Sequence, residues 1–230
     1  MDWSPLWISL QIAIPATAIT VFLGIICAWR VYRTEKRRRR ITDAILTLPL
    51  VLPPTVAGFL LLMLFGKKGI LGEPLLQMGI RVVFTKSAAV IAAITISFPL
   101  MYRSAKAAFE QVDHNLVHAA RTLGMPELRI FCRVILPLAL PGVISGGILS
   151  FARAMGEFGA TLMIAGNIPG ETQTMPQAIY MSIQGGRTKE ATGWVILLMF
   201  LSFVMIVGMN AMALRKMKWE RKHYEHNDRD

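Results

Sequence analysis

Long apolar stretches separated by short charged segments form the main pattern along this chain of 230 residues. A helix that crosses a membrane needs about 20 mostly apolar residues. Five stretches reach or approach that length, and they predict five membrane-spanning helices. In chain order they are Trp3–Trp29, Ala44–Gly66, Ser87–Tyr102 (extended to Phe109, because Arg103 and Lys106 can reach the interface), Val134–Ala152 and Ala191–Leu214.

Two further uncharged pieces, Phe158–Gly170 and Thr172–Gly186, are too short to span a membrane alone. They are rich in Gly, Pro and Thr, which is typical of irregular backbone. Lipid cannot satisfy the N–H and C=O groups of such backbone, so it must be buried in protein or line a wet cavity. We therefore expect a re-entrant or surface structure here.

The composition indicates a membrane protein with one domain, residues 1–230. Hydrophobic residues make up 54% of the chain, and charged residues make up only 17%, below the roughly 25% usual for soluble domains. The net charge of +11 lies in blocks between the apolar stretches, which is the pattern of a topology signal. Nucleic-acid binding is therefore not expected.

The basic residues predict an N-terminus outside the cell and a C-terminus in the cytoplasm. With that orientation the cytoplasmic segments are 30–42, 103–133 and 214–230, and they hold eighteen of the 25 Lys and Arg residues. The last segment, with the tail 215–230, is too short for a folded domain.

Two other classes of function lack their expected residues. A membrane enzyme needs a nucleophile–base pair or a metal cluster, but the predicted spans contain no His, Asp or Glu. The pair His114 and His118 supplies only two ligands, and a zinc site would need at least one more. A secondary anion transporter would show an inverted repeat or ionisable groups in mid-span, and the sequence shows neither.

The segment between the third and fourth spans, about residues 110–133, has helical character. Leu116, Ala119, Ala120 and Leu123 follow the i, i+3, i+4, i+7 spacing and predict one face of a helix. The small side chains of this face would allow close docking of another protein. The residues alone leave a second alternative, an amphipathic helix at the membrane surface without a partner.

The boundaries of this short helix are also marked. Asp113 or Asn115 can cap its N-terminus, and Gly124 suits the left-handed position after its C-terminus. Pro126 prevents continuation and can begin a second helix.

This segment resembles the coupling motif of ABC importer permeases. That motif has an acidic residue, Ala-Ala, three residues, Gly, nine residues, and then a hydrophobic residue, any residue and Leu-Pro. Here Val134 is the hydrophobic residue, and His118 departs from the motif by replacing the acidic residue. The resemblance assigns contact with an ATPase to His118, Ala119, Ala120, Arg121, Gly124, Leu136 and Pro137.

The resemblance implies the type I ABC importer permease fold, all-α, in the bacterial cytoplasmic membrane. It also implies a homodimer, two ATP-binding subunits on the cytoplasmic side and an external binding protein. The chain lacks a Gly-x-x-x-x-Gly-Lys-Ser/Thr phosphate loop. We therefore expect ATP to be bound and hydrolysed by the partner subunit, with no cofactor in this chain.

Two further segments resemble the molybdate branch of the sulfate, thiosulfate and molybdate permeases. They are Leu48–Leu62 (LPLVLPPTVAGFLLL) and Phe151–Tyr180. The resemblance implies import of molybdate and of the chemically similar tungstate. Because the core Gly156–Thr161 is shared with the sulfate branch, a sulfate or thiosulfate permease is the alternative.

A tetrahedral dianion needs hydroxyl and N–H donors that hold it weakly enough for release. Hydroxyl residues near breaks in the spans are candidates for this role. The predicted path and gate consist of Pro53, Pro54, Thr55, Ser97, Ser150, Gly156, Glu157, Phe158, Gly159 and Thr161.

Glu157 is unusual in an anion path, because a carboxylate repels the cargo. We expect it to be structural, either paired with Arg153 at i−4 or accepting backbone N–H bonds in the Gly-rich turn. The alternative is a place on the external rim, where it would help dock the binding protein.

Overall fold

The computed structural model describes residues 2–34 and 36–227, without the side chains of 36, 37, 209, 210 and 212–227. The predicted tail 215–230 thus lies outside the described side chains. The described backbone is helical and contains no strand, which confirms the predicted all-α class. The helices are α1 (Ser4–Tyr32), α2 (Lys36–Val51), α3 (Pro54–Phe65), α4 (Gly72–Gln77), α5 (Lys86–Glu110), α6 (His114–Thr122), α7 (Glu127–Ile130), the π-helix η1 (Phe131–Ile135), α8 (Leu136–Met155), α9 (Gly159–Ala165), α10 (Met175–Gln184) and α11 (Thr188–Asn227).

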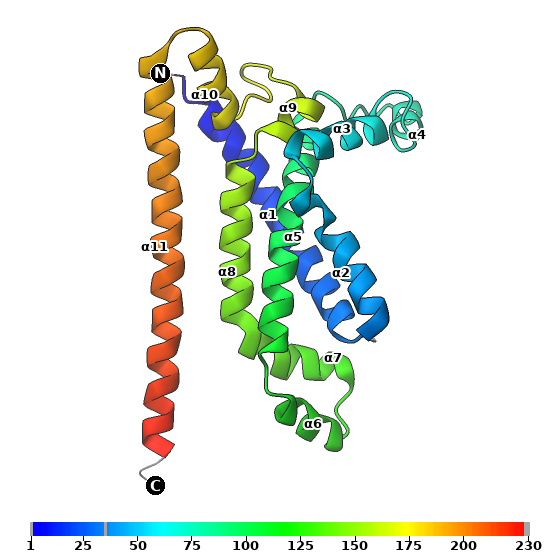
Figure 1. Ribbon diagram of the computed structural model, residues 1–230, viewed down its shortest axis with the longest axis vertical. Coiled ribbons are helices and arrows are strands. Elements are labelled where there is room, and N and C mark those ends of the chain that lie inside the picture. Colours follow the sequence, from blue (N-terminus) through cyan, green and yellow to red (C-terminus); the bar gives the residue numbers. More distant parts are fainter. Residues whose placement is uncertain (1, 35, 228–230) are drawn as a thin grey trace.

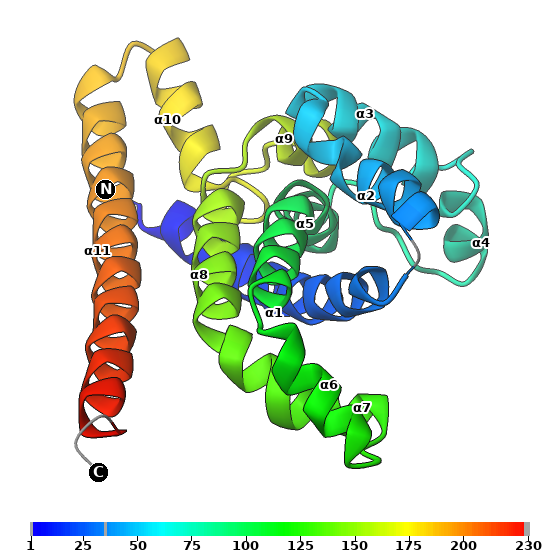
Figure 2. The same cartoon turned by 60° about the horizontal axis from the view of Figure 1, so that its bottom comes forward.

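Four of the predicted spans are continuous helices. The helices α1, α5 and α11, and α8 together with α7 and η1, are long and apolar enough to cross a membrane. The helix α5 packs against both α1 and α8, which also contact each other (Figure 1, Figure 2). Its most apolar stretch is 56% buried, whereas that of α11 is 11% buried. The helix α11, which forms the fifth predicted span, thus contacts the bundle loosely.

The second predicted span, Ala44–Gly66, is not one continuous helix. It divides into α2 and α3, whose axes meet at an angle of 107°. The cause is local: Pro53 and Pro54 carry no backbone N–H, and a proline biases the residue before it toward extended backbone. Figure 1 shows α3 leaving the end of α2 sideways and leading to α4.

The segments predicted to be cytoplasmic gather toward one end of the bundle. In Figure 1 the α1–α2 turn and α6 with α7 lie in the lower part, and α11 runs down to the same end. The helices α3, α4, α9 and α10 lie at the opposite end, near the N-terminus. In Figure 2, α6 and α7 project away from the helices of the bundle.

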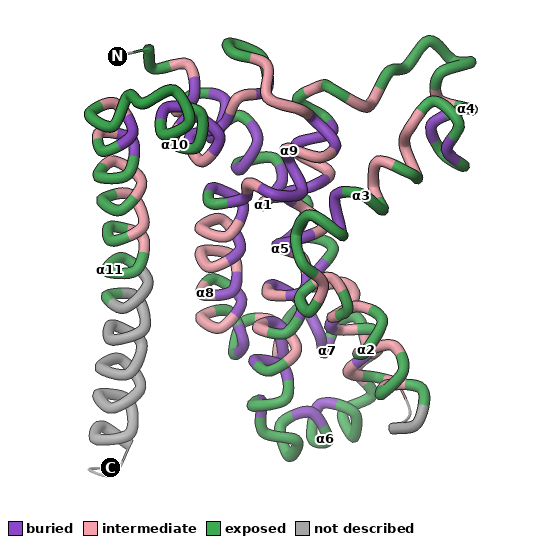
Figure 3. The backbone as a smooth tube through the Cα atoms, turned by 45° about the horizontal axis from the view of Figure 1, so that its top comes forward, coloured by how far each residue is buried: buried purple, intermediate pink, exposed green. Residues whose placement is uncertain are grey.

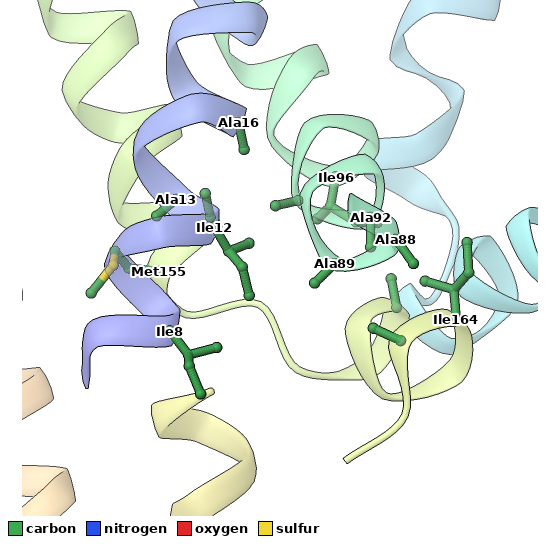
Figure 4. Packing of buried hydrophobic residues seen from close by; sticks show 14 of the residues in the cluster. Ile8, Ile12, Ala13, Ala16, Ala88, Ala89, Ala92, Ile96, Met155 and Ile164 are labelled. Carbon is green, nitrogen blue, oxygen red and sulfur yellow. The ribbon is translucent and has the colours of Figure 1, made fainter. Parts of the chain in front are cut away.

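Small side chains form the core between α1 and α5. Ala13 and Ala16 of α1 and Ala89 and Ala92 of α5 are fully buried. They belong to one cluster that also includes Ile164 of α9 (Figure 4). Small residues let membrane helices approach closely and gain dispersion contacts. Close packing of small residues thus holds α5 in the middle of the bundle.

The outward faces of the helices carry large apolar side chains, as a lipid environment requires. Phe22 of α1 and Phe200 of α11 are 63% and 61% exposed. Figure 3 shows exposed and partly exposed residues recurring along α11 and α3. Apolar surface of this extent is unusual for a soluble monomer.

Candidate functional site

The break between α2 and α3 places Thr55 at the first turn of α3. The backbone at Pro53 is extended, and its carbonyl accepts from the N–H groups of Val56 and Ala57 at 2.9 and 3.1 Å. Thr55 is exposed. The Thr55 hydroxyl is therefore an exposed donor at the bend between α2 and α3.

A second break follows α8. Gly156 ends this helix, and α9 begins at Gly159. Glu157, between them, is 2% exposed. Its Oε1 accepts the N–H of Ala160 at 2.8 Å, and its Oε2 lies 2.6 Å from the Arg153 guanidinium. Both predicted contacts of this carboxylate are present, so it ties α8 to the start of α9.

Two glycines bring the breaks together. A Cβ on Gly58 of α3 would lie 2.7 Å from the Cα of Ala160. A Cβ on Gly159 of α9 would lie 3.1 Å from the Cβ of Pro54 and 3.3 Å from the N of Thr55. The two predicted gate segments, 53–55 and 156–161, thus form one site, which we call the elbow site.

Gly58→Val should separate α3 from α9. Its Cβ would meet the Ala160 backbone, which cannot move aside as a flexible side chain can. Such overpacking costs about 1–3 kcal/mol. We expect a lower thermal unfolding midpoint of the purified protein in detergent. Gly208→Val serves as the control, since a Cβ there meets no atom within 4 Å. Equal midpoints for the two variants would contradict the close packing.

Ser97 and Ser150 do not reach the elbow site. Both are fully buried, with Ser97 on α5 and Ser150 on α8. The Ser97 hydroxyl lies 3.2 Å from that of Thr20 on α1, and the Ser150 hydroxyl donates to the Ser97 carbonyl at 3.5 Å. These hydroxyls join three helices. Thr161 is also buried, at 1% exposed, which leaves Thr55 as the exposed hydroxyl among the four predicted donors.

Ser97→Ala should therefore act mainly on stability. An interhelical hydrogen bond inside a membrane protein contributes about 0.6 kcal/mol on average. We expect a small decrease in the free energy of unfolding, measured by denaturant titration in mixed micelles. Thr95→Val on the same helix is the matched control, because the described hydrogen bond of Thr95 stays within α5. A variant as stable as the parent would mean that this contact adds nothing.

At the other end of the bundle, α6 has the predicted boundaries. The Asp113 carboxylate accepts the Asn115 N–H at 2.8 Å, and Gly124 has a φ of +73°. Pro126 precedes α7. Arg121 donates to Glu127 at 2.8 Å, which fastens α6 to α7 and raises the pKa of Arg121. The loop is therefore an ordered helical pair.

The predicted apolar face of α6 is not a buried face. Ala120 is buried, together with Val117, which the prediction omitted. Leu116 and Leu123 are 49% and 81% exposed, and Ala119 is also exposed. The expectation that Ala120 is open for docking is thus wrong, because this side chain packs inward. His118 and Arg121 are exposed, while Leu136 is half-buried and Pro137 exposed at the start of α8.

The sequence interpretation missed Gly58 and the contacts of Asp43. Gly58 stands among large apolar residues, where a glycine signals close backbone approach. Asp43 bounds the second predicted span and pairs with Lys106 and with the Tyr102 hydroxyl of α5. Within the described part of the chain, no group of three or more His, Cys, Asp and Glu residues could hold a metal ion.

The helical arrangement and the projecting α6–α7 pair agree with the fold expected of an ABC importer permease. The chain belongs to the family described as the binding-protein-dependent transport system inner membrane component, which it matches over residues 20–216. It is therefore a multi-pass protein of the cytoplasmic membrane.

Individual relatives agree with this family. The chain is 45% identical over 193 residues to the molybdenum transport system permease protein ModB of Escherichia coli (strain K12), covering 83% of this chain and 84% of the relative. It is 38% identical over 215 residues to ModB of Haemophilus influenzae, with coverage of 93% and 92%. A solved structure of the MetNI methionine ABC transporter, in an inward-facing conformation, matches with a TM-score of 0.72 at 17% identity, covering 92% of this chain and 95% of that one. The type I permease fold is thereby confirmed.

Proposed function

We propose that this chain is the permease subunit of an ATP-driven importer of molybdate, and of tungstate as a chemically similar ion. The observation that carries the proposal is the similarity to molybdenum permeases over most of both chains. The exposed α6–α7 pair supplies a surface through which an ATPase can drive the spans.

The proposed complex contains two copies of this chain, two ATP-binding subunits and an external molybdate-binding protein. In the membrane, the end with α6 and α7 faces the cytoplasm, as the Lys and Arg bias favours. The ATPase contacts the exposed face of α6 around His118, Ala119 and Arg121, while Gly124, Leu136 and Pro137 set the direction of the loop. ATP hydrolysis takes place on the partner.

The elbow site forms the outer part of the proposed path. Thr55 offers a hydroxyl to the oxyanion, and Gly159 permits the close approach of α9 to α3. Glu157 shapes the site from within, because the Ala160 N–H donates to one of its oxygens and the Arg153 guanidinium lies against the other as an ion pair. Weak contacts of this kind suit a permease, since the anion must also leave.

The test is ATPase activity of the reconstituted complex in liposomes. The permease alone should show none. With its ATP-binding subunit, activity should rise when molybdate-loaded binding protein is added and stay unchanged with sulfate-loaded protein. Stimulation by the sulfate-loaded protein would assign the chain to the sister branch. Anion flux from the permease alone, without any ATPase bound, would contradict the proposal.

A further inference from the structure

A cluster of charged and polar side chains joins α2 to α5. The Asp43 carboxylate of α2 accepts from the Tyr102 hydroxyl and from the Lys106 ammonium group, both on α5. One turn earlier on α2, Arg39 pairs with Glu110, the last residue of α5. We call these five residues the ionic clasp.

The rest of α2 has few contacts with its own chain. It packs mainly on α5, and of its described side chains Leu46 joins the neighbouring buried cluster. Its opposite face is exposed, with Ile41 and Ile45 each 63% exposed. The ionic clasp is therefore the main specific attachment of this helix to the bundle.

The contact surface between α2 and α5 is only partly closed. A cavity of about 410 Å³ separates parts of the two helices, and Thr47 and Arg103 line it together with members of the clasp. The paired side chains of the clasp remain 18–41% exposed. Partly exposed ion pairs gain little net energy, so they can break and re-form readily. This differs from the dry packing of α1 on α5.

The position of the clasp links the two ends of the molecule. Glu110 lies three residues before Asp113, which caps α6. The other end of α2 meets Pro53 and Pro54, where α3 and the elbow site begin. With 16 residues, α2 spans about 24 Å at 1.5 Å per residue. The helix α2, which contains Pro49, therefore runs from the start of the α6 segment to the elbow site.

We propose that the ionic clasp transmits movement of α6 to the elbow site by positioning α2 on α5 in one state of the transport cycle and releasing it in the other. A contact made in only one of two states biases the equilibrium between them. The clasp residues are positioning residues, since they act through α2 and not on the anion. The inference rests on the proposed ATP-driven transport.

The test is a charge reversal in the full complex, with permease, ATP-binding subunit and molybdate-loaded binding protein in proteoliposomes. Molybdate uptake and ATP hydrolysis are measured together, and their ratio reports the coupling. In Lys106→Asp and in Asp43→Lys, uptake per ATP should fall about tenfold while ATP hydrolysis continues. The double variant Asp43→Lys with Lys106→Asp restores the pair in reverse and should recover most of the ratio.

Arg187→Gln is the matched control. It removes an exposed ion pair with Glu190, 3.3 Å away at the other end of the bundle, and should leave the ratio unchanged. If Lys106→Asp does not assemble, Arg39→Gln tests the more exposed pair of the clasp in the same way. A lower ratio in that variant supports the clasp, and an unchanged ratio contradicts it.

The results separate the two proposals. An unmodified complex without molybdate-stimulated activity would contradict the proposed function itself. An unmodified complex that transports, with single variants that keep its uptake per ATP, would contradict the clasp alone. Single variants that lose coupling without recovery in an assembled double variant would also contradict it, because the two charges would then act separately.

Discussion

Replacing Ala119 by arginine is expected to abolish ATP-driven uptake while the permease stays folded. Ala119 is exposed on α6, and Ala120 and Val117 hold this helix from its other side. A long charged side chain at this place would keep a partner from approaching the helix. Disruption at the centre of an interface costs about 2–4 kcal/mol, or roughly 30- to 1,000-fold in affinity. The measurement is the Kd between the ATP-binding subunit and the permease in nanodiscs.

Ala119→Ser is the matched control for this variant. Serine keeps the side chain small, so the ATP-binding subunit should bind within a few-fold of the parent affinity. An unchanged thermal midpoint of Ala119→Arg would show that α6 itself is intact. Full affinity and full uptake in Ala119→Arg would mean that the ATPase docks elsewhere, and the proposed coupling surface would be wrong.

The α6 segment illustrates what local sequence can predict. Asp113, Gly124 and Pro126 set the helix boundaries through contacts within a few residues, and the structure has them as predicted. The apolar spacing showed which residues share a face of the helix. It could not show that Leu116 and Leu123 stay exposed, because that depends on which neighbours the folded chain supplies.

The same limit applies to the second span. Its apolar length predicted one span, whereas α2 and α3 meet at an angle of 107°. Pro53 and Pro54 explain locally why the helix breaks, but not where α3 then packs. The helix α3 lies where Gly58 meets Ala160, about a hundred positions further along the chain. Nothing in the local pattern identifies that pairing.

For polar side chains in or beside the apolar stretches, contacts between residues near in the sequence were predicted, and contacts between distant residues were missed. The Glu157–Arg153 pair was predicted from the i−4 spacing, which is local in the sequence even though Glu157 lies just beyond the end of α8. The ionic clasp was missed, since Asp43 lies 59 and 63 positions from its partners Tyr102 and Lys106. Ser97 was predicted to donate a hydrogen bond to the transported anion. The packing of α1 on α5 instead places its hydroxyl inside a helix interface, beside that of Thr20.

Glu157→Gln should lower uptake if this carboxylate supports the elbow site. The glutamine can still accept the Ala160 N–H through its amide oxygen, but it loses the charge that pairs with Arg153. Loss of a charge-assisted contact costs about 1.5–3 kcal/mol. Glu157→Ala loses the same charge and also the hydrogen bond to the Ala160 N–H, which adds about 1 kcal/mol. The thermal midpoint should therefore fall in the order parent, Gln, Ala.

Molybdate uptake distinguishes this role from a place in the anion path. A carboxylate facing the cargo repels it, so its removal would raise uptake or lower the KM. A structural carboxylate gives the opposite result, with a lower kcat and a similar KM. Higher uptake in Glu157→Gln would contradict the structural role.

The double variant Arg153→Gln with Glu157→Gln completes the test. Each single change leaves a charge without its partner, whereas the double change removes both charges from a largely buried place. Replacing both partners of a buried pair is often close to neutral, while removing one is costly. We therefore expect the double variant to be more stable than Glu157→Gln alone. If the losses of stability in Arg153→Gln and in Glu157→Gln simply add in the double variant, the ion pair does not hold α8 to α9. The hydrogen bond from the Ala160 N–H to Glu157 must then make that contact.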